Sequence, residues 1–316
     1  MENVKKRRGE RKMRLQDKLV PYLEYCTYRK ELDQKTVKAS QIDLNQYFTF
    51  VACEEPDKEK IEEYITELHK KYKQKTVKRK IASVKAYYSY LEENELIKES
   101  PFRKIKVKFK ENLIPRIIPR EEIEHLLNHM YGCLQQASET VYKYCLRDVA
   151  VIELFFATGA RVYEISNIRA ENVNLNTGLI QLMGKGAKER YVQIGSTSVL
   201  NILRKYYAEN RAAIKKSGYF FVNGRGNRYT EQSIRLMLKK YTAQAGIERN
   251  ITPHMFRHSF ATYLIEEGVD ISCVQRILGH SSIKTTQIYI HVAARKQAEI
   301  LRDMHPRNNM KIIGAA

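Results

Sequence analysis

The sequence contains few cysteines and no pattern that would use them. The five cysteines, Cys26, Cys53, Cys133, Cys145 and Cys273, are odd in number and form no Cys-x-x-Cys pair. Neither a disulfide framework nor a zinc site is indicated, and buried reduced thiols are the expectation. The chain also lacks an apolar run of membrane-spanning length and a signal-peptide core, so no membrane partner is expected.

Acidic residues are scarce relative to basic ones. The 316 residues include 56 Lys and Arg but 36 Asp and Glu, which gives a formal net charge of +20. The excess is spread along the chain, because residues 1–114 carry +9 and the remainder carries +11. An excess of this size points to a polyanion, most often nucleic acid, that touches both halves. Hydrophobic residues make up 43%, and the length suits two domains.

The first part of the chain is predicted to be a helical bundle. After a basic arm over residues 1–14, apolar side chains recur at helical spacing in four stretches: 15–31, 36–53, 61–72 and 77–91. We assign residues 15–110 to this bundle. Several cations fall mainly away from the apolar stripe of the last helix and are candidate phosphate contacts: Lys75, Lys78, Arg79 and Lys85.

Lysine alternates with apolar residues after the bundle. The run Glu99–Lys110, with Pro115 and Pro119 beyond it, is typical of an extended chain, and we place the linker at 111–118. Lys106 and Lys108 are two further candidate DNA contacts, although an ordinary charged linker fits this composition as well.

A second unit is predicted over residues 119–309, followed by a tail over 310–316. Its elements are a helix that begins at Pro119, a helix over about 145–157 that ends at Gly159, a hairpin of strands 179–183 and 190–194, and three or four helices from about 230 to 305. The fold class is therefore mainly α with a small β-sheet.

The candidate catalytic residues are cationic, imidazole and phenolic. No convincing carboxylate cluster for a metal is present, and no P-loop. The candidates are Arg161, which opens a helix; Lys185, at a Gly-Lys-Gly turn; His254 and Arg257, on one helical face at i and i+3; His280, after Leu-Gly; and Tyr289. Each alone is more often a packing residue or a surface ion pair, so their joint order is the informative feature.

That order and the surrounding residues resemble the tyrosine recombinase or integrase family, most of all bacterial Xer-type enzymes and mobile-element integrases. The motifs are Thr158-Gly-Ala-Arg-Val-Tyr-Glu-Ile165, Gly184-Lys-Gly-Ala-Lys-Glu-Arg190, Thr252-Pro-His-Met-Phe-Arg-His-Ser-Phe-Ala-Thr262 and Leu278-Gly-His-Ser-Ser-Ile-Lys-Thr-Thr-Gln-Ile-Tyr-Ile-His-Val292. The resemblance spans the chain. It implies a helical, SAM-like core-binding domain followed by an α+β catalytic domain.

The resemblance also implies a site-specific recombinase that breaks and rejoins DNA. The roles would be attack on the scissile phosphate by Tyr289 to form a 3′-phosphotyrosyl bond, transition-state stabilisation by Arg161 and Arg257, protonation of the leaving 5′-oxygen by Lys185, assistance to the nucleophile by His254, and support of the phosphate by His280. Because the phosphotyrosyl bond conserves the free energy of the broken bond, neither ATP, metal nor another cofactor is expected.

The partners implied are double-stranded DNA with an inverted-repeat core site, a second copy on that site, and a homotetramer at synapsis with a Holliday-junction intermediate. A sister recombinase or accessory proteins are compatible with this assembly, and the expected location is the cytoplasm, on the nucleoid. Residues 131–144 look like an insertion that forms a lid, a protein contact or neither. The apolar stripe over 291–304 packs either on its own domain or on a neighbouring protomer.

Two other readings stay open. A type IB topoisomerase uses much the same chemistry without synapsis, but the small size and the core-binding domain favour recombination. A non-catalytic DNA-binding regulator would be indicated by loss of a catalytic residue, and none is lost. A helix-turn-helix repressor would explain the charge but not the order of the motifs. The sequence leaves open whether the task is dimer resolution, integration, excision or inversion.

Overall fold

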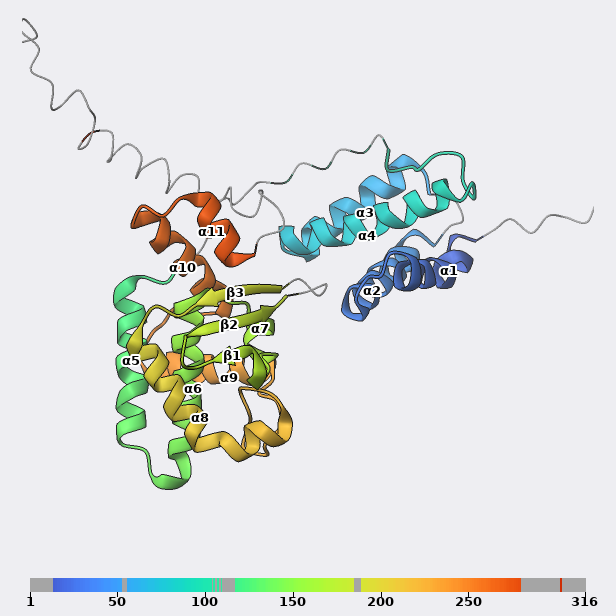
Figure 1. Cartoon of the computed structure of the whole chain (residues 1–316). Coiled ribbons are helices and arrows are strands. Elements are labelled where there is room, and N and C mark those ends of the chain that lie inside the picture. Colours follow the sequence, from blue (N-terminus) through green and yellow to red (C-terminus); the bar gives the residue numbers. More distant parts are fainter. Residues whose placement is uncertain are drawn as a thin grey trace, which may run out of the picture. The chain divides into compact units, whose positions relative to one another are not determined.

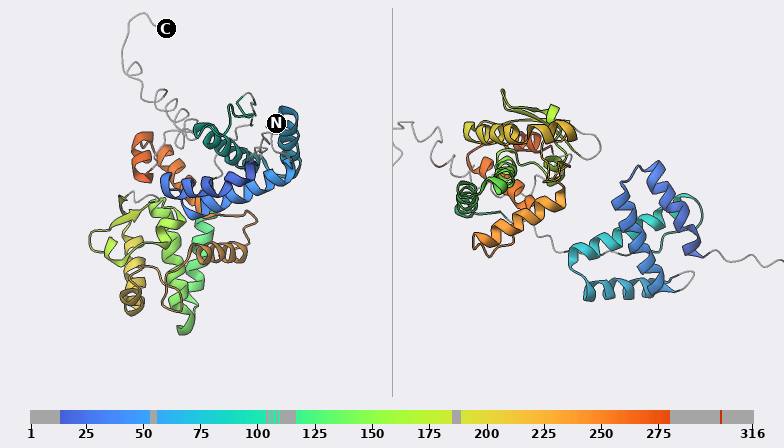
Figure 2. Two further views of the ribbon diagram at one scale, coloured as in Figure 1. Left: turned by 90° about the vertical axis from the view of Figure 1, so that its right-hand side faces the viewer. Right: turned by 90° about the horizontal axis from the view of Figure 1, so that it is seen from below.

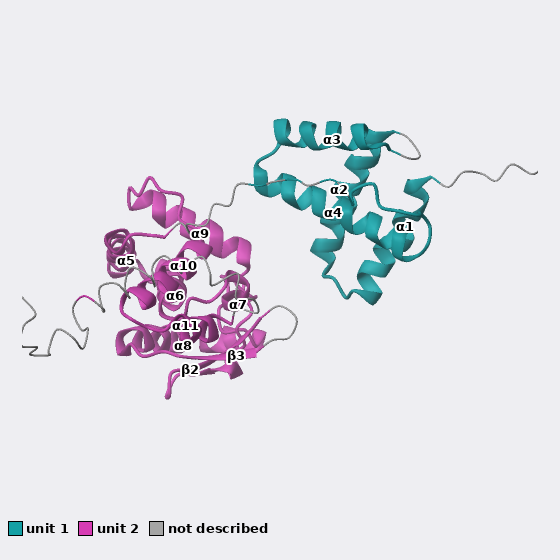
Figure 3. Ribbon diagram, turned by 90° about the horizontal axis from the view of Figure 1, so that it is seen from above, with its two compact units in different colours: residues 1–111 teal, residues 112–316 magenta. Residues whose placement is uncertain are grey.

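The chain is mainly helical and divides into two compact units, residues 1–111 and 112–316 (Figure 1, Figure 3). The computed structural model describes residues 14–52, 56–103, 105, 107, 109, 117–184, 189–279 and 302. Within these ranges no helix is long and apolar enough to cross a membrane.

Unit 1 is a bundle of helices around one core (Figure 2). Its elements are the 3-10 helix η1 (Leu15–Lys18), α1 (Leu19–Glu24), the π-helix η2 (Tyr25–Arg29), α2 (Gln34–Val51), α3 (Lys58–Lys71) and α4 (Gln74–Glu93). Asp33 and Asp57 begin α2 and α3, where each carboxylate accepts a hydrogen bond from the third backbone N–H of the helix. The four predicted helical stretches are confirmed, although the first consists of three short pieces.

The core of unit 1 is rich in tyrosine. Tyr47 on α2 and Tyr88 on α4 are both buried, and their hydroxyl groups share a hydrogen bond of 2.9 Å. Phe102 and Ile105, which follow α4, are buried in the same core. The apolar positions of the alternating run therefore belong to the bundle as far as Phe109, which also packs on the core, and not to a free linker.

Unit 2 is built around α6, which is buried on most of its faces (Figure 1). The elements of the unit are α5 (Arg120–Gln135), α6 (Glu139–Thr158), α7 (Val162–Ser166), the 3-10 helix η3 (Ala170–Asn172), β1 (Val173–Asn174), β2 (Leu179–Met183), β3 (Glu189–Gln193), α8 (Thr197–Ser217), α9 (Glu231–Gln244), α10 (Pro253–Glu266) and α11 (Ile271–Leu278). Helices α5, α8 and α10 pack directly on α6, which explains why nearly every residue of its C-terminal half is apolar.

The strands form one antiparallel sheet in the order β1-β2-β3. Ile180 pairs with Val192 and Leu182 pairs with Arg190. Ile180, Leu182 and Val192 are buried and define the inner face of the sheet. Residues opposite one another in an antiparallel pair lie on the same face, so Arg190 also points inward. The predicted hairpin is confirmed, with β3 beginning one residue earlier, at Glu189.

Two features of unit 2 differ from the predictions. Helix α8, with 21 residues, was not predicted at all. Helix α6 begins at Glu139, and α5 continues to Gln135, so residues 131–144 form the two helix ends of a hairpin joined through 136–138. The segment described as an insertion is therefore mostly helical, and its role as a lid, a protein contact or neither stays a prediction.

Candidate active site

The junction between α6 and α7 places Arg161. Helix α6 ends at Thr158 and is capped by Gly159, whose φ of 58° is left-handed, and the chain turns at once into α7. A Cβ at this position would lie 2.5 Å from Phe260 and 2.8 Å from Leu278, so glycine is required by both conformation and space. Arg161 is the residue that begins α7, which confirms that it opens a new helix.

Arg161 is held by Glu164. The Glu164 carboxylate is buried and accepts hydrogen bonds from the Arg161 backbone N–H at 2.7 Å and from Arg161 Nη1 at 3.0 Å. The same carboxylate pairs with Arg190. Burial raises the pKa of Glu164, but the hydrogen bonds and charges of Arg190 and Arg161 outweigh it, and the net pKa is below the usual value. Glu164 is therefore a carboxylate between two guanidinium groups.

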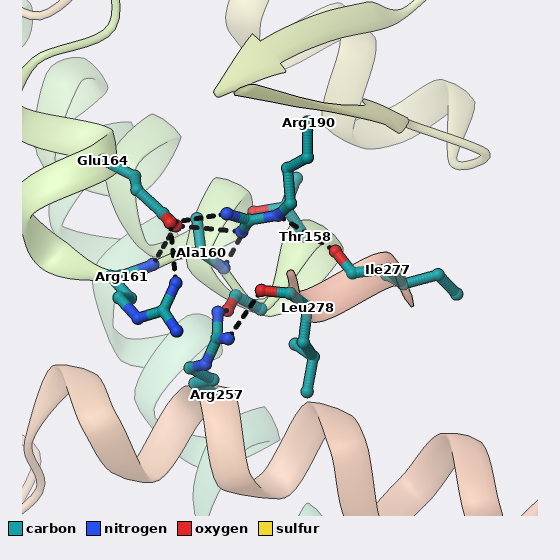
Figure 4. A network of polar contacts seen from close by, with 9 residues as sticks. Thr158, Ala160, Arg161, Glu164, Arg190, Arg257, Ile277 and Leu278 are labelled. Atoms are coloured by element: carbon teal, nitrogen blue, oxygen red, sulfur yellow. Dashed lines mark hydrogen bonds and ion pairs between the residues drawn. The ribbon is translucent and has the colours of Figure 1, made fainter. Parts of the chain in front are cut away.

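Arg257 reaches the same junction from α10. Its side chain is buried, and Nη1 donates to the Gly159 carbonyl at 2.8 Å while Nη2 donates to the Leu278 carbonyl at 2.6 Å. Figure 4 shows the Arg161 and Arg257 guanidinium groups beside this junction, approached from α7 and from α10. The Arg161 side chain retains 38% exposure, so this cationic site is open on the Arg161 side.

The histidines beside Arg257 differ in environment. His254 is exposed in the first turn of α10, whereas His258 is half-buried one turn later. Burial lowers the pKa of the His258 imidazole, and the nearby His254 and Arg257 lower it further. His254 and Arg257, which were predicted to share one helical face, both lie near the N-terminus of α10, and this helix begins at Pro253.

Three of the six predicted catalytic residues, Lys185, His280 and Tyr289, lie outside the described residues. The described chain flanks two of them in sequence. Strand β2 ends at Met183 and β3 begins at Glu189, on either side of 185–188, and α11 is followed by Gly279, whose φ is 64°. The predicted stripe over 291–304 lies almost wholly outside the described residues as well.

The predicted DNA contacts of unit 1 have mixed environments. Lys75, Lys78 and Arg79 are exposed on α4. Arg79 also pairs with the buried carboxylate of Asp43. Lys85 is half-buried, and its Nζ donates to a backbone carbonyl of the alternating run at 3.2 Å. Lys106 and Lys108 lie outside the described residues.

Two charged residues of the site were not singled out from the sequence. Glu164 and Arg190 both stand inside the motifs that carry the resemblance, but neither was named as a site residue. Glu164 is the third residue of α7, and its carboxylate accepts from the backbone N–H of Arg161 just before the helix, as the glutamate of a capping box does. The described residues contain no group of three or more His, Cys, Asp or Glu side chains able to hold a metal ion.

Two family profiles match the chain. The Phage integrase family matches residues 116–296, and the Phage integrase N-terminal SAM-like domain matches residues 19–95. A tyrosine recombinase of Agathobacter rectalis is 46% identical over 301 residues, which cover 93% of this chain and 98% of the relative. Tyrosine recombinase XerD of Listeria innocua is 32% identical over 305 residues, 93% of this chain and 100% of the relative.

Solved structures share the fold. The XerH site-specific recombinase bound to palindromic difH substrate, in a post-cleavage complex, matches with a TM-score of 0.72 at 22% identity, over 91% of this chain and 84% of that one. A lambda integrase dimer (residues 75–356) bound to a COC′ core site matches with a TM-score of 0.69 at 15% identity, over 96% and 100%. The motifs, the paired guanidinium groups of the α6–α7 junction and these matches agree: the chain belongs to the phage integrase family of tyrosine recombinases.

Proposed function

We propose that this recombinase cuts a DNA strand by attack of the Tyr289 hydroxyl on the scissile phosphate and rejoins it by the reverse reaction. The observation that carries the proposal is the meeting of Arg161 and Arg257 at the α6–α7 junction (Figure 4). Two guanidinium groups held by a buried carboxylate and by backbone carbonyls are suited to the oxygens of a phosphoryl group, because planar N–H forks match that geometry.

The proposed reaction is a transfer between two oxygens. The Tyr289 oxygen forms a bond to phosphorus as the bond to the 5′-oxygen breaks, leaving a 3′-phosphotyrosine and a free 5′-hydroxyl. The phenol proton passes to His254, and the ammonium of Lys185 protonates the departing oxygen. Arg161 and Arg257 offset the negative charge that grows on the non-bridging oxygens, and His280 supports the same phosphate. No step in this scheme consumes ATP or a metal ion.

The substrate proposed is double-stranded DNA with an inverted-repeat core site. A homodimer on each site is supported by the likeness to a lambda integrase dimer on a core site, and a palindromic substrate is bound by the XerH relative. A homotetramer that passes through a Holliday junction follows from the pairing of two such sites. The exposed cations of α4 are proposed to contact phosphates. Because the substrate is chromosomal or mobile-element DNA, the proposed location is the cytoplasm.

Covalent capture tests the proposal. The protein is incubated with fragmented host DNA in the presence of a chelator, denatured, and separated from free DNA, and the attached DNA is sequenced. The wild-type chain is expected to capture discrete sites, and Tyr289→Phe is expected to capture none. Tyr28→Phe is a matched control, because Tyr28 is 79% exposed on unit 1.

The outcomes of this experiment test the nucleophile, the reaction type and the target separately. Capture by Tyr289→Phe would refute Tyr289 as the nucleophile, and the lack of capture by a wild-type chain that binds DNA would support the regulator reading. A gel assay on two copies of the recovered site separates a recombinase, which yields exchanged strands, from a topoisomerase, which only relaxes supercoils. The identity of the captured sites distinguishes chromosome dimer resolution from integration and excision.

A further inference from the structure

Arg190 is a charged residue on the inner face of a hydrophobic sheet. It pairs with the buried Leu182 and alternates with the buried Val192 along β3. Only 11% of its side chain is exposed. Removing an ion from water costs several kcal/mol unless well-placed hydrogen-bond and ion-pair partners offset that cost. A guanidinium group at this position therefore needs such partners.

The partners of Arg190 lie on two other elements. Both terminal nitrogens donate to the Glu164 carboxylate, Nη2 at 2.8 Å, and the Nε group donates to the Ile277 carbonyl at 3.0 Å. Figure 4 shows this guanidinium between the α7 carboxylate and the end of α11. One planar fork therefore ties β3 to α7 and to α11.

The α7 contact determines where Arg161 lies. Glu164 accepts from the backbone and the side chain of Arg161 at 2.7 and 3.0 Å while it pairs with Arg190. Hydrogen bonds from Arg161 on one side and Arg190 on the other restrict the buried Glu164 carboxylate to one orientation. Arg161 therefore depends on Arg190 for the orientation of its own partner.

The α11 contact determines where α11 ends. The carbonyls of Ile277 and Leu278 accept from Arg190 and from Arg257 respectively. Gly279 packs under the Arg190 side chain, since a Cβ there would lie 3.0 Å from Arg190 Cδ. Helix α11 also packs on a small separate cluster whose buried members are Ala261, Ile265, Val274 and Leu278. The next residue along the chain is His280.

We infer that Arg190 is a positioning residue for DNA cleavage, which aligns Arg161 through Glu164 and fixes the end of α11 through the Ile277 carbonyl without contacting DNA. The inference rests on the proposed cleavage chemistry. Lysine does not replace arginine here, because one ammonium does not reproduce a fork that spans a carboxylate and a carbonyl on two different elements. Displacement of these groups is expected to act on the chemical step and not on DNA affinity.

The test separates rate from affinity. The DNA is a nicked duplex that carries a site recovered by covalent capture, and the single-turnover rate of phosphotyrosine formation is measured at saturating DNA beside the Kd. We expect Arg190→Gln and Arg190→Lys each to lower the rate about 100-fold, the loss typical of a misplacement of about 1 Å, with the Kd unchanged. The control is Arg204→Gln, because Arg204 also binds a backbone carbonyl, that of Leu175, but touches none of the site residues.

A second measurement does not depend on activity. Amide hydrogen exchange over Ile271–Leu278 is expected to be faster in Arg190→Lys, which keeps the buried charge, while exchange in α8 is unchanged. Full activity of Arg190→Lys, equal loss of rate and affinity, or unaltered exchange in α11 would each overturn the inference. A wild-type chain that forms no covalent complex on the same duplex would instead refute the proposed function.

Discussion

Replacing Gly159 with alanine is expected to damage unit 2 in two separable ways. The residue has a φ of 58°, a conformation that costs a side-chain-bearing residue about 1–2 kcal/mol. The new methyl group would lie 2.5 Å from Phe260 and 2.8 Å from Leu278, and forcing a methyl group into a packed site costs a further ~1–3 kcal/mol. Together, Gly159→Ala should lower the free energy of unfolding by about 2–5 kcal/mol.

Gly246→Ala is the matched control for this substitution. Gly246 has a φ of 69°, but a Cβ there would meet no atom within 4 Å. Its replacement should cost only the conformational part, about 1–2 kcal/mol. The difference between the two variants is the energy of the clash alone.

Urea unfolding followed by far-UV circular dichroism measures both variants, and single-turnover cleavage should fall in Gly159→Ala but not in Gly246→Ala. The second effect is expected because the Gly159 carbonyl accepts from Arg257 Nη1 at 2.8 Å. Equal unfolding free energies for the two variants would refute the packing argument. Equal cleavage rates would refute the link from this glycine to Arg257.

Three further predictions concern charge. Lys75→Gln should reduce the slope of log Kd against log salt by about 1 without loss of stability. Lys80→Gln should instead cost about 1–3 kcal/mol of stability, because Lys80 is 3% exposed and its loss removes a partner from a buried carboxylate. DNA binding at several salt concentrations measures the first effect, and thermal unfolding measures the second. Burial lowers the pKa of His258 below its usual 6.5, so the unfolded chain binds the proton first and the stability of the folded chain should fall as the pH drops below 6.5. In thermal unfolding below pH 6.5, the melting temperature of His258→Gln should depend less on pH than that of the wild-type chain. Asp148→Ala should cost about 3–5 kcal/mol in a denaturant titration, because the buried Arg147 loses its partner at 2.7 Å, and a cost below 1 kcal/mol would contradict this assignment.

Much of the local structure follows from the sequence. The helical spacing of α4, the end of α6 at Gly159 and the hairpin around 185–188 are each determined by neighbouring residues, through periodicity or turn chemistry. Helix α8 was missed although it has 21 residues and is capped by Ser196. Its buried residues, Val199, Ile202, Leu203, Tyr206 and Ile214, recur at helical spacing, so periodicity was a sufficient signal for this helix. Its packing against α6, in contrast, could not be inferred from the segment alone.

The site was predicted from the sequence only in part, and the reason differs from that for α8. Arg161 and Arg257 were identified by motif, but their environments were not, because a buried Arg257 with two carbonyl partners has no local signature. Arg190 was assigned to a strand and given no role. Its function depends on a register that turns it inward and on partners far away in the chain. Such convergence is a property of the tertiary structure and not of any single segment.

The separation of the two cores has a consequence for chimeras of such proteins. Within the described residues, the tyrosine-rich core of unit 1 and the core around α6 have no member in common. Each core is therefore complete within its own unit. Chimeras that join the bundle of one relative to the second unit of another are therefore expected to fold.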